Sequence, residues 1–226
     1  MNLRVLVCLL VLGAACKSAP PPRPPSADAL SARSPAPAPA SAAKKRVVFL
    51  GDSLTAGFGL PAGAAFPARS QARRDAAGLA FEVTNAGISG DTSAGALRRL
   101  DWIFQRPVDV LWVCLGANDG LRGLPVEALE QNLLALVRRA QAKGAKVVLA
   151  GMQLPRNYGA DFRDRFAAVF PRVAQQTGAV LLPFLLEGVA GDPALNLPDG
   201  IHPNAQGQER VAAHVYAGLV PVLRGL

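Results

Sequence analysis

The sequence predicts an α/β fold, a three-layer sandwich in which helices cover both faces of a five-stranded parallel sheet. Two observations lead to this prediction. Short apolar runs alternate with longer amphipathic stretches along most of the chain, which is typical of strands that alternate with helices. The stretches between successive runs are also long enough for crossover helices, and parallel strands cannot be joined without such crossovers.

The expected strands are short runs rich in apolar and β-branched residues, a composition typical of strands that are buried on both faces of a sheet. In chain order they are residues 47–50, 81–84, 110–115, 146–150 and 179–182.

The expected helices lie between these runs and after the last one, at residues 67–77, 93–105, 125–143, 161–177 and 204–223. In the third helix, Leu129, Leu133 and Leu136 recur at helical spacing and form an apolar face. Lys143 lies at its end, where a positive charge interacts favourably with the helix dipole. Gly144 follows and is expected to end the helix.

Residues 1–16 have the features of an export signal. A positively charged residue precedes an apolar stretch at 5–12 that is too short to span a bilayer, and residues 13–15 are small. Cys16 follows directly, an arrangement that resembles a bacterial lipobox, although Gly13 stands where Leu is usual. We expect Cys16 to be lipidated, so that the exported protein is anchored to a membrane in the cell envelope or periplasm. Ordinary cleavage nearby, which would leave a secreted protein without an anchor, is the alternative.

Residues 17–45 are rich in Pro, Ala and Ser, and we expect them to form a disordered tether because they cannot bury enough apolar surface to offset chain entropy. Residues 46–226 are then one folded domain of ordinary size. Residues 1–46 hold seven of the 24 Lys and Arg but one of the 16 Asp and Glu, so the rest of the chain has a net charge of only +2. This distribution argues against a nucleic-acid partner for the domain.

The three cysteines do not provide a disulfide framework for the mature domain. Cys8 lies in the expected signal, Cys16 is expected to carry lipid, and Cys114 lies within an apolar run. No intramolecular disulfide is then available. No Cys and His cluster has metal-ligand spacing, and we expect neither a metal nor another cofactor.

Four short polar blocks follow apolar runs or precede the last expected helix. They are Gly51-Asp52-Ser53-Leu54, Asn85-Ala86-Gly87, Gly116-Ala117-Asn118-Asp119 and Asp199-Gly200-Ile201-His202. Because ligands bind beyond the carboxyl ends of parallel strands, the Ser53 hydroxyl is expected at that edge of the sheet. Gly-Asp-Ser-Leu alone would also suit an ordinary turn, and it is the coincidence of four ordered blocks that favours a functional site.

Ser53, His202 and Asp199 form the expected catalytic triad. A serine hydroxyl is a poor nucleophile unless a base takes its proton, and histidine is the usual base near neutral pH. Asp199 precedes His202 by three residues and is placed to orient the imidazole, although a turn and helix cap is the alternative for this pair. His214 is interpreted as a packing or surface residue within the last helix. Ser89 is a weaker candidate for the nucleophile, because no strand-to-helix elbow of the GxSxG kind surrounds it.

In this order the four blocks resemble the SGNH, or GDSL, hydrolase superfamily, and the resemblance covers residues 46–226. Residues 116–123 are similar to its thioesterase I, lysophospholipase and arylesterase branch. The resemblance implies a flavodoxin-like SGNH hydrolase fold. It also implies an oxyanion hole formed by the backbone N–H groups of Ser53 and Gly87 and by the side-chain amide of Asn118.

The same resemblance implies that residues 118–123 form a mobile loop that adjusts to bound acyl chains, with a rigid connection between strand and helix as the alternative. The residues expected to bind substrate are Asp119, Gly120, Leu121 and Arg122 in this loop, and Leu154 and Pro155 after the fourth strand. Asp119 is expected to organise the loop rather than to act as an acid. Asp52 is expected to support the loop of the nucleophile and not to join the triad.

The expected function is that of a serine esterase of the arylesterase, lysophospholipase or acyl thioesterase type, which hydrolyses its substrates through an acyl-enzyme. Its expected partners are small acyl esters, thioesters or lysophospholipids, and the protein is expected to be a monomer. One alternative keeps the site but makes the protein a carbohydrate O-acetylesterase or an acyltransferase of the cell envelope. The other alternative is a tethered envelope lipoprotein without enzymatic activity, and the presence of all four blocks argues against it.

Overall fold

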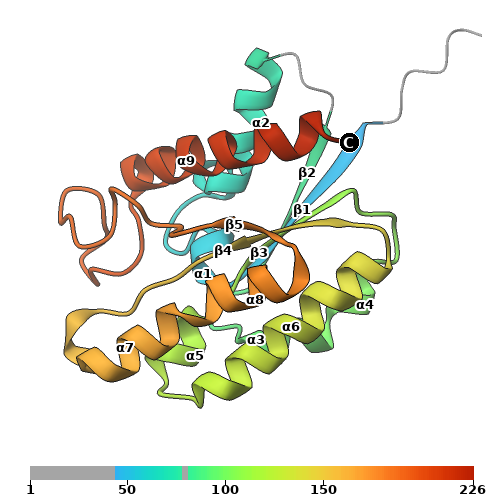
Figure 1. The fold of residues 1–226 in the computed structure, drawn as a ribbon. Helices are drawn as coiled ribbons and strands as arrows, with labels where there is room; N and C mark the ends of the chain where they lie inside the picture. The colour runs from blue at the N-terminus through green and yellow to red at the C-terminus, as the bar shows by residue number, and fades with distance from the viewer. Residues whose placement is uncertain (1–43, 78–80) are drawn as a thin grey trace, which may run out of the picture. The chain divides into compact units, whose positions relative to one another are not determined.

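The computed structural model describes residues 44–77 and 81–226, and it confirms the predicted α/β fold (Figure 1). Five strands form one sheet, in which every neighbouring pair is parallel, in the order β2-β1-β3-β4-β5. Their bounds are β1 Lys45–Gly51, β2 Phe81–Gly87, β3 Val110–Cys114, β4 Lys146–Ala150 and β5 Val180–Leu182. All five expected strands are present. The first two continue past their apolar runs to Gly51 and Gly87, because their backbones stay paired to that point.

Helices lie on both faces of the sheet. Their bounds are α1 Ser53–Ala56, α2 Phe66–Ala77, α3 Ser93–Arg98, α4 Leu100–Ile103, α5 Ala117–Leu121, α6 Val126–Ala142, α7 Ala160–Ala167, α8 Val169–Thr177 and α9 Ala205–Arg224, with 3-10 turns η2 Ala62–Ala64 and η3 Arg156–Tyr158. α2 and α9 cover one face, and α3, α4, α6 and α8 cover the other (Figure 1). Within the described residues, no helix has the length and apolar character needed to cross a membrane.

Two of the expected helices are divided in the structure. The stretch 93–105 contains α3 and α4, which meet at Arg99, and the stretch 161–177 contains α7 and α8, which meet at Ala168. Arg99 has φ −94° and ψ 5°, which lies outside the helical region and changes the direction of the chain. The periodicity of apolar residues continues across such a break, and it therefore predicts one helix where the backbone forms two.

The core of the domain lies around the central strands. Every residue of β3 is buried, and so is the stretch 47–50 of β1. The rings of Phe49 and Trp112 pack with their centroids 5.7 Å apart, and Leu133 and Leu136 of α6 are fully buried. Burial of this apolar surface is the main favourable contribution to folding, and it holds the ends of the central strands in place.

The carboxyl ends of the three neighbouring strands β2, β1 and β3 lie at the same edge of the sheet. In the register of the sheet, Gly51 of β1 lies opposite Gly87 of β2 and Cys114 of β3. After β1 the chain forms β2 on one side, and it then returns to form β3 on the other side. This edge is therefore a topological switch point, which is where open α/β sheets bind ligands. The short helices α1, which carries Ser53, and α5, which carries Asn118, follow β1 and β3 at this edge.

The predictions for residues 1–43 lie outside the described residues. They comprise the export signal, the lipidation of Cys16 and most of the tether. The expected end of the tether needs a correction, because Lys45 already belongs to β1 and its Nζ lies 3.4 Å from Oδ1 of Asp109.

Candidate active site

Ser53 is the first residue of α1 and lies directly beyond the end of β1. Asp52 caps this helix, since its Oδ1 accepts a hydrogen bond from the Leu54 N–H at 3.0 Å. The cap ends the strand and starts the helix at a fixed residue. It therefore places the partly exposed Ser53 side chain at the edge of the sheet.

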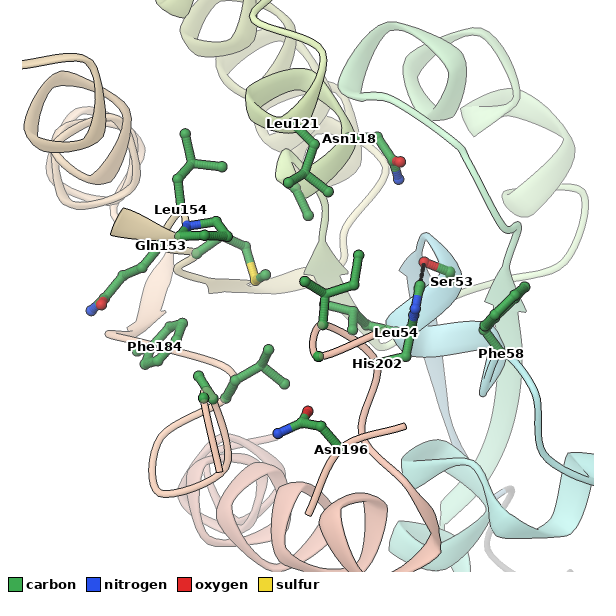
Figure 2. Close-up of a pocket in the computed structure, with 18 of the residues that line it drawn as sticks. Ser53, Leu54, Phe58, Asn118, Leu121, Gln153, Leu154, Phe184, Asn196 and His202 are labelled. Atoms are coloured by element: carbon green, nitrogen blue, oxygen red, sulfur yellow. Dashed lines mark hydrogen bonds between the residues drawn. The ribbon is translucent and has the colours of Figure 1, made fainter. Parts of the chain in front are cut away.

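His202 lies against Ser53, as Figure 2 shows, with its Nε2 atom 2.9 Å from the Ser53 Oγ. Its Nδ1 atom lies 2.8 Å from Oδ2 of Asp199. An ionised carboxylate can only accept hydrogen bonds, so Nδ1 donates to Asp199 and Nε2 is left to accept from the Ser53 hydroxyl. The three expected triad residues are thus brought into one hydrogen-bonded chain, and this chain can deprotonate Ser53.

Asp199 is held by the loop that carries it. Its Oδ1 accepts hydrogen bonds from the backbone N–H groups of Ile201 and His202, each at 3.0 Å. The loop is closed by a hydrogen bond of 2.7 Å from the Leu197 N–H to the His202 carbonyl. Partial desolvation raises the pKa of Asp199, but the two N–H groups and the His202 ring outweigh it and hold this pKa below its ordinary value. Asp199 therefore stays ionised when it orients the imidazole.

Phe58 packs against the imidazole of His202 (Figure 2). The ring centroids of Phe58 and His202 lie 4.5 Å apart with an interplanar angle of 34°. The aromatic face restricts rotation of the imidazole and favours the positive charge that the ring carries after it takes a proton. Phe58 was not predicted from the sequence, because a single aromatic residue in a loop carries no signal of such a contact.

Asn118 lies at the end of the cavity that contains Ser53, and Figure 2 shows its amide on the Ser53 side. Its Nδ2 donates a hydrogen bond of 3.0 Å to the carbonyl of Asp91. Since an amide group has two N–H donors, this contact fixes the side chain and leaves a second N–H for a substrate oxygen.

The structure contradicts the expected role of Gly87 in the oxyanion hole. The Gly87 N–H donates to Oδ1 of Asn85 at 2.9 Å, and Gly87 does not line the cavity. A Cβ atom at this position would lie 2.3 Å from the backbone nitrogen of Ala56. Glycine is therefore needed at position 87 because the backbone of α1 packs directly against it.

Gly90, rather than the expected Gly87, lines the cavity together with Ser53 and Asn118. It is the third residue of a turn closed by a 3.0 Å hydrogen bond from the Asp91 N–H to the Ile88 carbonyl. Its φ of 80° is the positive value that the third position of a type II turn requires. Among the described residues, no acceptor binds the N–H of Gly90 or of Ser53. Both N–H groups are available to an oxyanion.

The expected substrate-binding residues divide into two groups. Leu121, Leu154 and Pro155 line the cavity, whereas Asp119, Gly120 and Arg122 do not. Asp119 is buried and accepts hydrogen bonds from the N–H and the hydroxyl of Ser93, at 2.9 and 2.5 Å, which ties α5 to α3. A Cβ atom on Gly120 would lie 2.6 Å from Cδ2 of Leu154 and 2.8 Å from Cε2 of Phe166, so a side chain there would require these two side chains to move. These two residues support the cavity wall from behind.

Arg122 and Tyr158 brace the two sides of the site. Nη2 of Arg122 donates a 2.7 Å hydrogen bond to the carbonyl of Gly90, which links α5 to the turn that carries the Gly90 N–H. The Tyr158 hydroxyl donates to the Leu121 carbonyl at 3.0 Å. The segment predicted as a loop is thus a short helix tied at its end to both neighbouring loops.

A cavity of about 720 Å³ extends from Ser53 across the edge of the sheet to Leu154 (Figure 2). Its apolar lining residues are Leu54, Phe58, Ala117, Leu121, Met152, Leu154, Pro155, Phe184, Leu186, Ala190 and Ile201. A mostly apolar cavity of this size, with a few polar groups at one end, is typical of a site for a small ligand.

The remaining serine and histidine candidates have other partners. Ser89 also lines the cavity, but Nε2 of His202 faces Ser53. His214, the other histidine, lies 2.9 Å from the Phe184 carbonyl through its Nε2 and joins α9 to the segment after β5. No imidazole is therefore placed to activate Ser89.

An α/β sheet that presents a hydrogen-bonded serine and histidine at its switch point, next to unpaired N–H donors, defines a serine hydrolase. The chain belongs to the GDSL-like Lipase/Acylhydrolase family, which matches residues 49–210. This confirms the family resemblance of the sequence blocks.

The chain is similar to several curated and solved relatives. It is 43% identical to the esterase TesA of Pseudomonas aeruginosa over 80% of this chain and 91% of that protein. It is 37% identical to the thioesterase 1/protease 1/lysophospholipase L1 of Escherichia coli, over 81% of this chain and 87% of that protein. The crystal structure of the psychrotrophic esterase EstA from Pseudoalteromonas sp., inhibited by monoethylphosphonate, matches with a TM-score of 0.77 and 36% identity, over 80% of this chain and all of that one.

Asp52 gives a prediction for the pH dependence of stability. Burial raises the pKa of Asp52 to about 7, and the nearby charges of Asp91 and Asp119 add to this effect, although the Leu54 N–H opposes it. The folded protein thus keeps a proton that the unfolded chain releases at lower pH. The contribution of Asp52 to stability is therefore greatest at low pH and is lost as the pH rises through about 7.

Asp52→Asn keeps the oxygen that accepts from Leu54 but cannot ionise. We expect the free energy of unfolding, measured with urea, to decrease less between about pH 5 and about pH 8.5 in this variant than in the wild type. Asp192→Asn is the matched control, because Asp192 accepts the same kind of local hydrogen bond, from the Ala194 N–H, at an exposed position. An equal pH dependence in wild type and Asp52→Asn would refute this account.

Proposed function

We propose that the protein is a serine esterase that hydrolyses carboxylic ester or thioester bonds of acyl substrates through a covalent acyl-enzyme. The observation that supports this most directly is the 2.9 Å contact between His202 and Ser53 at the end of the apolar cavity. An acyl chain can lie in the cavity while its carbonyl carbon is next to the Ser53 hydroxyl.

In the proposed reaction, Nε2 of His202 takes the proton of the Ser53 hydroxyl while Oγ attacks the carbonyl carbon. Asp199 holds the imidazole and balances its positive charge. The oxyanion forms beside the N–H groups of Ser53 and Gly90 and the amide of Asn118. Collapse of this intermediate breaks the bond to the alcohol or thiol, which leaves with the proton from His202. Water then releases the acyl group by the same steps and restores Ser53.

Small acyl esters, thioesters and lysophospholipids are the proposed substrates. The similar proteins are named as esterase, arylesterase and thioesterase/lysophospholipase. The apolar walls of the cavity support an acyl chain as the part of the substrate that is buried.

Replacement of the nucleophile tests the proposed function. Ser53→Ala should lower hydrolysis of p-nitrophenyl butyrate by about a thousandfold or more, because no hydroxyl remains to form the acyl-enzyme. The variant should also lose labelling by a fluorophosphonate probe, whereas Ser89→Ala should keep it. Circular dichroism checks that the variants are folded. Undiminished turnover by folded Ser53→Ala would rule out this mechanism.

We also propose that the protein is exported and anchored in the cell envelope through lipid on Cys16. We further propose that it is a monomer. Support comes from the signal-like residues that precede Cys16 and from the Pro, Ala and Ser-rich segment that follows it. Cys16→Ala should abolish incorporation of labelled palmitate in bacterial cells and move the esterase from the membrane fraction to the soluble fraction. Equal labelling of wild type and variant would exclude an anchor at this residue.

A further inference from the structure

Two arginine side chains line the cavity in addition to the catalytic groups. They are Arg156 of η3 and Arg163 of α7. Among the described residues that line the cavity there is no Asp and no Glu. Two permanent positive charges therefore line the cavity, on the exposed Arg156 and the half-buried Arg163, and no carboxylate among the lining residues balances them.

Neighbouring arginines outside the cavity are neutralised by carboxylates. Nη2 of Arg165, on the same helix as Arg163, lies 2.8 Å from Glu127, and Nη2 of Arg172 lies 2.6 Å from Glu130. In the described part of the chain, no carboxylate lies within ion-pair distance of Arg156 or Arg163. In this respect the two arginines of the cavity differ from Arg165 and Arg172, whose charges are balanced by carboxylates.

Arg163 is held at the end of the cavity that is far from the nucleophile. Its Nε donates a hydrogen bond of 3.1 Å to the carbonyl of Leu154. Figure 2 places Leu154 across the cavity from Ser53. Since Nε is used in this contact, the terminal Nη groups of the guanidinium remain for a ligand. Leu121 and Met152 belong to the apolar wall of the same cavity.

We propose that Arg163 and Arg156 select substrates that carry a negatively charged group, a carboxylate or a phosphate, at a distance from the scissile bond. This inference rests on the proposed esterase function. The apolar walls hold the hydrocarbon part of such a substrate, the carbonyl lies at Ser53, and the anionic group lies at Arg163.

Physical chemistry favours this substrate over a neutral one of the same length. A guanidinium binds a carboxylate or phosphate through charge-assisted hydrogen bonds, which are stronger than neutral ones. This attraction is greater at the half-buried Arg163 than at the exposed Arg156, because water screens a charge less where the side chain is partly buried. A neutral chain end would displace water from the two arginines without replacing its hydrogen bonds, and it would therefore bind less well.

Matched substrate pairs test the proposal. One pair places the charge on the acyl part: 4-nitrophenyl hydrogen suberate against methyl 4-nitrophenyl suberate. The other places it on the alcohol part: 1-hexanoylglycerol 3-phosphate against 1-hexanoylglycerol. Selectivity is the ratio of kcat/KM for the charged substrate to kcat/KM for its neutral partner. It is measured for wild type, Arg163→Gln, Arg163→Lys, Arg156→Gln and the control Arg165→Gln.

We expect selectivity in at least one pair to fall about tenfold or more in Arg163→Gln, the loss that follows from removing a charged hydrogen-bond partner. Selectivity should fall less in Arg163→Lys, which keeps the positive charge, than in Arg163→Gln. It should also fall in Arg156→Gln. Arg165→Gln should keep the wild-type selectivity, because its side chain pairs with Glu127 outside the cavity. The pair that responds shows whether the acyl or the alcohol part carries the anion.

The proposal would be overturned if Arg163→Gln, Arg156→Gln and the wild type had the same selectivity in both pairs. It would also be overturned if selectivity fell as much in Arg165→Gln as in Arg163→Gln. Neither result would affect the esterase assignment, since the neutral esters would still be hydrolysed. Failure of the wild type to hydrolyse any of the four substrates would instead count against both.

Discussion

The site depends on the parallel pairing of β1 with β2 on one side and β3 on the other. This pairing ends the three strands at one edge of the sheet, with Gly51 opposite Gly87 and Cys114. Ser53, Gly90 and Asn118 are far apart in the sequence and meet there because each follows shortly after one of these strands. His202 reaches the same edge on the longer segment between β5 and α9. A buried core around Phe49 and Trp112 fixes the strands, and α1 packs closely enough against β2 that position 87 must be glycine.

Local chemistry made the fold and the triad predictable. Apolar runs gave the five strands, and Asp199 and His202 lie close enough in sequence that their contact needs only one loop. The divided helices and the oxyanion donor were not predictable in this way. Gly87 and Gly90 belong to the same block, and what separates them is tertiary: one N–H is taken by Asn85, and the other lies in a turn that faces the cavity. The pair Ser89-Gly90 before Asp91 is the feature of the sequence that indicates this turn.

The charges of the site form a consistent arrangement. At one end of the cavity, Asp199 is ionised and holds the imidazole, while Phe58 covers one face of the ring. At the other end, Arg163 and Arg156 have no carboxylate partner in the described part of the chain. Apolar side chains connect the two ends. A substrate that is apolar in the middle and negatively charged away from its carbonyl group would satisfy all three parts at once.

A crystal structure of the protein after reaction with a fluorophosphonate would show whether Ser53 is the nucleophile and which groups bind the oxyanion, because the tetrahedral phosphorus imitates the intermediate of acyl transfer. We expect phosphorus to be bonded to Oγ of Ser53, with the phosphoryl oxygen about 3 Å from the N–H groups of Ser53 and Gly90 and from the Asn118 amide. Phosphorus on another residue, or a phosphoryl oxygen directed away from Gly90 and Asn118, would contradict it.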